Sequence, residues 1–173
     1  MCTVYRRWVA VVALILTSIA NAADPSAPTL EFIFEEHVLL GEDISVGETP
    51  MGERNIVPII GGTFEGPGIR GSILPDGWDW QLKTAGGCFL IEADYMIKTD
   101  DGVVINVLNN GRFCESATGE HSSGLTTPVF EAPKGKYDWL NGGAYVGTLV
   151  LGETGAARAV HIRFYRAVKP SGS

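Results

Sequence analysis

The chain has 173 residues and carries 13 lysines and arginines against 20 aspartates and glutamates, a formal net charge of −7. An acidic chain with scattered basic residues lacks the positive surface that nucleic acids and anionic membranes bind, so neither is an expected partner. The 22 glycines and nine prolines favour strands and turns over helices, and the length suits one domain with its own core.

The first 22 residues have the three parts of a secretory signal peptide. Arg6 and Arg7 form a short basic start, an apolar run follows from Trp8 to Leu16, and Ala20-Asn21-Ala22 offers small residues at the cleavage positions. The apolar run is shorter than the roughly 20 residues that cross a bilayer. We therefore expect cleavage after Ala22 and a secreted or periplasmic protein without membrane contact, with an uncleaved N-terminal anchor as the alternative.

A linker is expected over residues 23–29, and from residue 30 short β-rich runs alternate with Gly, Pro, Asn or Asp residues. The expected strands are 30–40, 45–49, 54–60, 81–98, 103–114, 130–132, 144–151 and 160–168. The glycine-rich stretch 61–80 is too broken for a helix, and a helical turn is expected only around residues 137–141. Residues 119–127 resemble a mobile loop. This spacing predicts one all-β domain over residues 30–170, an antiparallel sandwich or barrel of about eight to ten strands.

One hairpin can be derived residue by residue. The sequence from Thr99 to Val103 is typical of a three-residue loop with Gly102 where a positive φ is needed. In the register that this loop sets, Cys88 faces Cys114 at a non-hydrogen-bonded pair, where Cα atoms approach to roughly 4.5 Å. Because Cys2 leaves with the signal peptide, these two cysteines would meet in an oxidising compartment. We expect a Cys88–Cys114 disulfide, with two buried thiols as the alternative.

The same register divides the hairpin into two faces. One face, which includes Tyr95, is apolar, whereas the other carries Glu92, Asn110 and Arg112. A carboxylate, an amide and a guanidinium on one face could line a pocket, with Glu92 as general base and Arg112 stabilising an enolate or carboxylate. The alternative is a solvated outer face with an ordinary cross-strand ion pair.

Two further clusters combine aromatic and polar residues, namely Trp78-Asp79-Trp80 and Trp139-Leu140-Asn141. Aromatic side chains beside an acid suit the wall of a cavity that holds a flat apolar ligand, and packing at strand ends is the alternative. The sequence has no nucleophile elbow, phosphate loop or dinucleotide fingerprint, and its histidines lack ligand spacing. We therefore expect neither a cofactor nor a metal.

The order of the motifs resembles a known family. Gly52-x-Arg54 is followed by IVPIIGGTFEGPGIRGSILPDGWDWQ, by the Tyr95 strand ending in TDDG, by Asn110-Gly111-Arg112, and by FEAP and YDWLN. This order is similar to that of the bacterial and fungal proteins grouped as domain of unknown function 3237, over about residues 30–168. The resemblance implies a small, closed or nearly closed antiparallel β-barrel, lipocalin-like in spirit. It also implies an acid at Glu92 and thereby favours the pocket interpretation of that face.

Three functions remain open. The first is an exported barrel that binds a small apolar or aromatic molecule. The second is a cofactor-free isomerase, cyclase or lyase in which Glu92 or Asp79 moves a proton and Arg112 assists. The third is a structural or interaction protein with a filled barrel, and a homo-oligomer is compatible with each. The catalytic candidates are Glu92, Asp79 and Arg112, and the ligand-binding candidates are Arg54, Trp80, Tyr95, Asn110, Glu131, Trp139 and Asn141.

Overall fold

Alternating apolar and polar residues give the chain ten antiparallel strands. The computed structural model describes residues 27–114, 124–154 and 157–169. The strands are β1 (Thr29–Leu40), β2 (Ile44–Thr49), β3 (Gly52–Gly66), β4 (Ile69–Ile73), β5 (Gly77–Lys83), β6 (Cys88–Thr99), β7 (Val104–Cys114), β8 (Leu125–Glu131), β9 (Ala144–Thr154) and β10 (Ala157–Val168), with a 3-10 helix η1 (Asp138–Gly142) between β8 and β9. The predicted all-β class and the predicted helical turn are confirmed.

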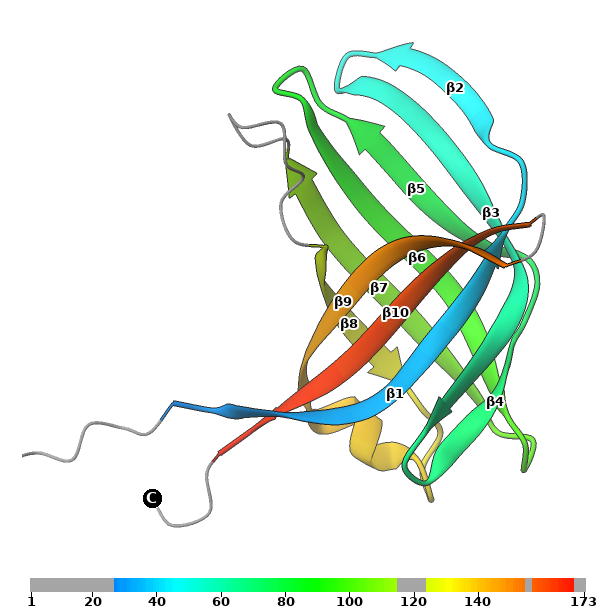
Figure 1. Cartoon of the computed structure of the whole chain (residues 1–173), viewed down its shortest axis with the longest axis vertical. Helices are drawn as coiled ribbons and strands as arrows, with labels where there is room; N and C mark the ends of the chain where they lie inside the picture. The colour runs from blue at the N-terminus through cyan, green and yellow to red at the C-terminus, as the bar shows by residue number, and fades with distance from the viewer. Residues whose placement is uncertain (1–26, 115–123, 155–156, 170–173) are drawn as a thin grey trace, which may run out of the picture.

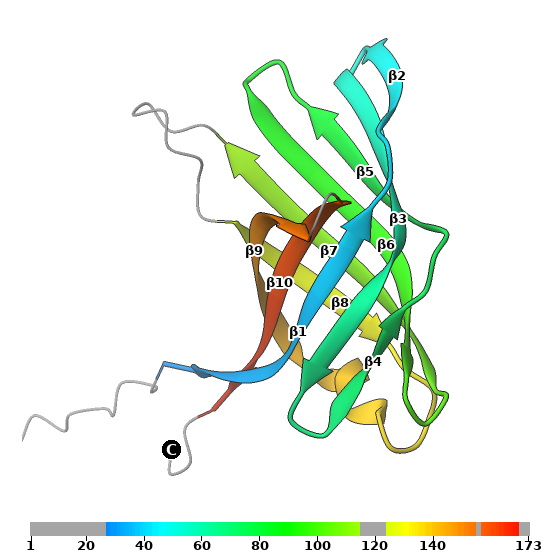
Figure 2. The same ribbon diagram turned by 45° about the vertical axis from the view of Figure 1, so that its right-hand side comes forward.

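The strands close into a barrel with eight positions around its wall, as the resemblance implied (Figure 1). The order β1-β10-β9-β8-β7-β6 leads to a position that two strands share, because β4 lies between β6 and β3 at one end and β5 does so at the other. β3 then pairs with β1 and closes the ring. β2 pairs with β3 beyond the segment where β1 does, so it extends one end of the wall (Figure 2).

Several observed strand boundaries differ from the predicted ones, mostly at glycines. The single strand expected over residues 81–98 is divided into β5 and β6 by a turn in which Gly87 has φ 77°. The glycine-rich stretch belongs largely to β3, β4 and β5 rather than to loops. Residues 125–127, expected to be mobile, begin β8. The rest of that expected loop (residues 119–123) and the expected signal peptide lie outside the described residues.

Gly62 permits the close approach that closes the barrel. It faces Val38 across the β1–β3 pair and has φ 140°. A Cβ atom there would lie 2.1 Å from the carbonyl oxygen of His37, which no side chain can do without moving the backbone. The absence of a side chain at Gly62 therefore allows β3 to pair with β1 and close the sheet.

The barrel interior is filled by apolar side chains at the end that holds β4 and η1. Phe34 is fully buried and its ring contacts the rings of Phe64, Phe130 and Phe164 at centroid distances of 5.2 to 5.7 Å. Such contacts between aromatic rings pack β1 against its neighbours β3 and β10 and, across the interior, against β8. None of the helices in the described ranges is long and apolar enough to cross a membrane.

The hairpin of β6 and β7 has the predicted register. Cys88 faces Cys114, Tyr95 faces Val107, and Gly102 has φ 89° in the connecting loop. The Cα atoms of Cys88 and Cys114 lie 4.1 Å apart and the two residues form the expected disulfide. The bond therefore links the two strands at the end of the hairpin away from the loop.

Candidate functional site

The polar face of the β6–β7 hairpin points outward. Glu92 and Arg112 are exposed, and Asn110 is half-buried on the same face. The residues that alternate with them, Ala93 and Tyr95, are buried and belong to the core. The expectation that this face lines a pocket is therefore wrong. Because the strands alternate, the mostly apolar set of the hairpin points inward and the set with Glu92, Asn110 and Arg112 points toward solvent.

Apart from Tyr95, the other predicted ligand-binding residues are also dispersed over the outside or the ends of the barrel. Trp80 is 45% exposed and shares the outer face with Arg54. Glu131 is exposed at the end of β8. Trp139 packs against the core, and the Asn141 side chain accepts a hydrogen bond from the Ala132 N–H at 2.7 Å and donates one to its carbonyl at 2.9 Å. Packing and backbone anchoring thus account for these last two residues.

Polar groups instead gather on the inner face of the barrel. We call them the interior polar cluster: Glu36, Asp79, Gln81, Tyr95, Asn109 and Thr126. The cluster unites Asp79 and Tyr95, which the sequence analysis named, with four residues that it did not. They come from five strands: β5, β6, β7 and β8 are neighbours in the sheet, and closure of the barrel brings Glu36 on β1 to them.

Glu36 is the most deeply buried acid of the cluster. It has no exposed surface and accepts a hydrogen bond of 2.5 Å from the Tyr95 hydroxyl through Oε2. Its other oxygen, Oε1, has no partner among the described residues. Burial raises the pKa of Glu36 from 4.5 to about 8, against the opposing effect of the Tyr95 hydrogen bond. Glu36 is therefore mostly protonated at neutral pH and able to donate a proton.

Asp79 is the second acid, on β5. It faces Ala93, whose side chain is in the core, so its own side chain points inward. The Gln81 amide donates a 2.7 Å hydrogen bond to Oδ2. Burial raises the pKa of Asp79, while the hydrogen bonds from Gln81 and from the Glu92 backbone oppose that rise. Two carboxyl groups whose pKa values are both raised by burial thus face one interior.

The Tyr95 hydroxyl links the two acids electrostatically. Burial raises the pKa of Tyr95 well above its usual value, and the charges of Glu36 and, more weakly, Asp79 add to this effect. Tyr95 therefore stays a neutral hydrogen-bond donor. Near the disulfide, the inward-facing Ile91 and Phe113 are half-buried, so the inner face meets solvent beyond the cluster.

The alternation of side chains along the strands contained a signal for two of the missed residues. Glu36 follows Phe34 at the spacing of two that keeps side chains on one face of a strand. Asn109 shares the parity of Val107 and Ile105 on the apolar face of the hairpin. Single polar residues within an apolar face are the pattern that could have found them.

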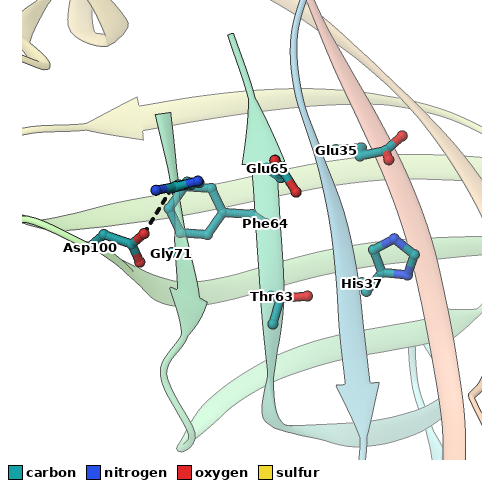
Figure 3. A pocket seen from close by; sticks show the side chains of 8 residues that line it. Glu35, His37, Thr63, Phe64, Glu65, Gly71 and Asp100 are labelled. Carbon is teal, nitrogen blue, oxygen red and sulfur yellow. Dashed lines mark ion pairs between the residues drawn. The ribbon is translucent and has the colours of Figure 1, made fainter. Parts of the chain in front are cut away.

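A separate hollow of about 410 Å³ lies on the outer surface of β1, β3 and β4 (Figure 3). Glu35 and His37 line it from β1, and Thr63 and Glu65 from β3. The hollow also contains an ion pair of 2.9 Å between Arg70 and Asp100, whose side chains are mostly exposed. These groups are solvated, so the hollow offers weaker acid–base chemistry than the interior polar cluster. In the described parts of the chain, no three His, Cys, Asp or Glu residues are placed to hold a metal ion.

Comparisons with known proteins agree with this architecture. A UPF0311 protein of Rhodopseudomonas palustris is 36% identical over 135 residues, 70% of this chain and 88% of that protein. A crystal structure of a β-barrel-like protein from Acinetobacter baumannii matches with a TM-score of 0.75 and 30% identity, over 84% of this chain and 99% of that one. The hydroalkoxylation enzyme phnH of Penicillium herquei is 28% identical over 129 residues, 75% of this chain and 79% of that enzyme.

The family model described as "Protein of unknown function (DUF3237)" matches residues 28–167, which include all ten strands except the last residue of β10. The match extends over the seam that closes the barrel and over all six residues of the interior polar cluster. The resemblance drawn from the order of motifs is confirmed: the chain belongs to the DUF3237 family.

Proposed function

We propose that this protein is a cofactor-free enzyme that moves protons at the interior polar cluster, adding a hydroxyl group across a carbon–carbon double bond of a small apolar substrate. The observation that carries the proposal is the fully buried Glu36, whose pKa is raised to about 8, together with a second inward-facing acid, Asp79, whose pKa is also raised. Buried carboxyl groups with different pKa values are the usual equipment for general acid–base catalysis at neutral pH.

The reaction needs only one proton donor and one acceptor. The Glu36 carboxyl group donates a proton to one alkene carbon, and the substrate hydroxyl oxygen forms a bond to the other. The hydroxyl proton passes to the Asp79 carboxylate, and the cluster then returns to its starting state by proton exchange with water. Atoms and charges balance without oxidant or reductant. Tyr95 holds the Glu36 carboxyl in place through its 2.5 Å hydrogen bond.

The relative in Penicillium herquei supports this choice of reaction, because it is described as a hydroalkoxylation enzyme and matches 75% of this chain. The geometry of this chain also replaces the roles first assigned to Glu92 and Arg112. Those side chains lie on the outer face, whereas Asp79 keeps the role of proton-transfer group.

An ortho-alkenyl phenol is the simplest probe of the proposal. Incubated with the protein in D₂O, it should yield a cyclic ether that carries one deuterium on carbon, detectable by mass spectrometry. Glu36→Gln should lower the rate by about 100-fold or more, because general acid catalysis contributes that much. Glu92→Gln is the matched control, since it removes an exposed acid from the outer face, and should keep the wild-type rate. Failure of the wild-type protein to cyclise any alkenyl phenol would contradict the proposal.

Binding without turnover is the second candidate function, favoured by the half-buried Ile91 and Phe113 on the inner face. In that case alkenyl phenols would raise the melting temperature of the protein without being converted. Measuring product and melting temperature with the same alkenyl phenol therefore separates the two functions.

We also propose that the protein is exported, since the Cys88–Cys114 disulfide suits an oxidising compartment. Protein recovered from the periplasm or medium of its source cell should begin at Ala23 and contain no free thiol. Reduction should lower its free energy of unfolding by about 3 kcal/mol, the value for a closed loop of this length. Urea titration with and without reductant measures the difference. Recovery of an intact leader or of free thiols would argue against export.

A further inference from the structure

Two buried polar side chains of the interior polar cluster have no hydrogen-bond partners. Asn109 has no exposed surface, and neither its Oδ1 nor its Nδ2 meets a partner among the described residues. Thr126, 1% exposed, has an equally unpartnered Oγ1. A buried polar group without a partner destabilises the fold, so the presence of several on one inner face requires an explanation.

The fold itself does not use the Asn109 amide. Asn141 shows what a structural asparagine does in this protein, since its amide bonds both the N–H and the carbonyl of Ala132. Asn109 instead interrupts an inward-facing apolar series on β7 that includes Val107 and Phe113. A leucine would suit that series better. The amide is therefore more easily explained by a ligand than by stability.

The surroundings of Asn109 define the ligand that suits it. Asn109 and Asp79 both face Ala93, one from each side, so a small side chain separates the amide from the acid. Thr126 faces Gly111, the next inward residue of β7. One row of facing residues contains Asp79 and Asn109, and the next contains Thr126. Across the described strands, these two rows hold one acid and one amide but no lysine or arginine. An anionic ligand would lie near the Asp79 carboxyl group without a cation to pair with, so an anion is disfavoured there and a neutral ligand is favoured.

We propose that Asn109, assisted by Thr126, is a recognition subsite for a neutral, planar ligand that presents a carbonyl oxygen and an N–H or O–H donor side by side, as a lactam does. Asn109 Nδ2 donates to the ligand carbonyl and Oδ1 accepts from the ligand donor, so both orphan atoms are satisfied together. The apolar Ile91 and Phe113 contact the ring of the ligand. The inference rests on the proposed function only in placing a ligand inside the barrel.

The test is a double-mutant cycle between the protein and the ligand. Calorimetry compares the lactam carbostyril with its N-methyl derivative, which keeps the carbonyl but lacks the donor, on the wild-type protein and on Asn109→Leu. Each single change should weaken binding about tenfold, the effect of losing one or two ordinary hydrogen bonds. In the variant, N-methylation should cause no further loss. Naphthoate, an anion of similar shape, should bind more weakly than carbostyril to the wild-type protein.

Asn110→Leu is the matched control, because Asn110 is the next residue of β7 and points outward; it should bind carbostyril as the wild type does. Asn109→Leu should keep or raise the urea midpoint, since it removes an unpartnered buried group. Thr126→Val, which changes only the hydroxyl, provides a second variant if Asn109→Leu fails to fold. Equal losses on N-methylation in wild type and variant, or no binding by the wild type, would overturn the subsite. Calorimetry measures binding and not the turnover of alkenyl phenols, so the result for the subsite does not depend on whether the proposed reaction occurs.

Discussion

Replacement of Glu36 by glutamine should remove most of the pH dependence of stability between about pH 5 and pH 8. Glu36 has a pKa of about 8 in the folded protein, against an ordinary value of 4.5. Between these values the folded state holds a proton that the unfolded state has released. The free energy of unfolding of the wild type therefore falls as pH rises through this range.

The size of the effect follows from the same two pKa values. The stability that protonated Glu36 contributes is fully present below pH 4.5 and is lost as pH rises through about 8. The difference corresponds to about 5 kcal/mol. Asp79, whose pKa is also raised by burial, acts in the same direction, so the wild-type curve falls further still. Glutamine cannot ionise and can still accept the hydrogen bond from Tyr95.

Urea unfolding of both proteins at intervals from pH 5 to pH 9 measures this difference. The variant should be close to the wild type at pH 5 and more stable than it at pH 8 and above. Glu35→Gln is the matched control, because Glu35 lies next to Glu36 on β1 and pairs with Arg163 on the surface. It should follow the wild-type curve. Parallel curves for the wild type and Glu36→Gln would show that Glu36 ionises normally in the folded barrel.

The second large effect is expected at Phe34. Phe34→Ala should lower the free energy of unfolding by about 3 to 5 kcal/mol, because it leaves a cavity among the rings of Phe64, Phe130 and Phe164. Phe32→Ala should cost less. A β-bulge separates Phe32 from Phe34, and Phe32 is half-buried; its ring makes an edge-to-face contact with Tyr165 and lies under the Arg163 guanidinium instead of entering the core. Thermal and urea unfolding of both variants provide the comparison. Equal losses would mean that the ring cluster does not concentrate the stability of the core.

The β6–β7 hairpin shows how far the sequence determines the structure. Its loop is local, so the residues from Thr99 to Val103 were enough to predict the register and the Cys88–Cys114 pair. Which face of the hairpin lies inside the barrel depends on strands far away in the sequence. For that reason the outward position of Glu92 was not predictable from the hairpin alone.

The interior polar cluster has the same origin. Asp79 was identified because it lies in the Trp78-Asp79-Trp80 cluster, and Tyr95 because its strand belongs to the order of motifs that resembles the family. Glu36 reaches Tyr95 only because β1 and β6 lie across the closed barrel. The bulge between Phe32 and Phe34 cannot be seen in the alternating sequence of β1, and it changes which of its phenylalanines enters the core. Closure of the barrel, which depends on the whole chain, therefore determines which residues meet at the site. Individual turns determine only the register of the strands around it.

The pairing of β1 with β10 has a consequence for the design of variants. Thr29 faces Val168, so the first and last strands enter and leave the barrel side by side, away from the Cys88–Cys114 end (Figure 1). A short linker between these two positions would join them without crossing the wall. New termini opened in the tight loop at Asp100-Asp101 would then give a circularly permuted barrel with every strand pair retained. Fusion partners could be moved in this way from the β1–β10 side to the β6–β7 loop at the same end of the barrel, leaving its interior untouched.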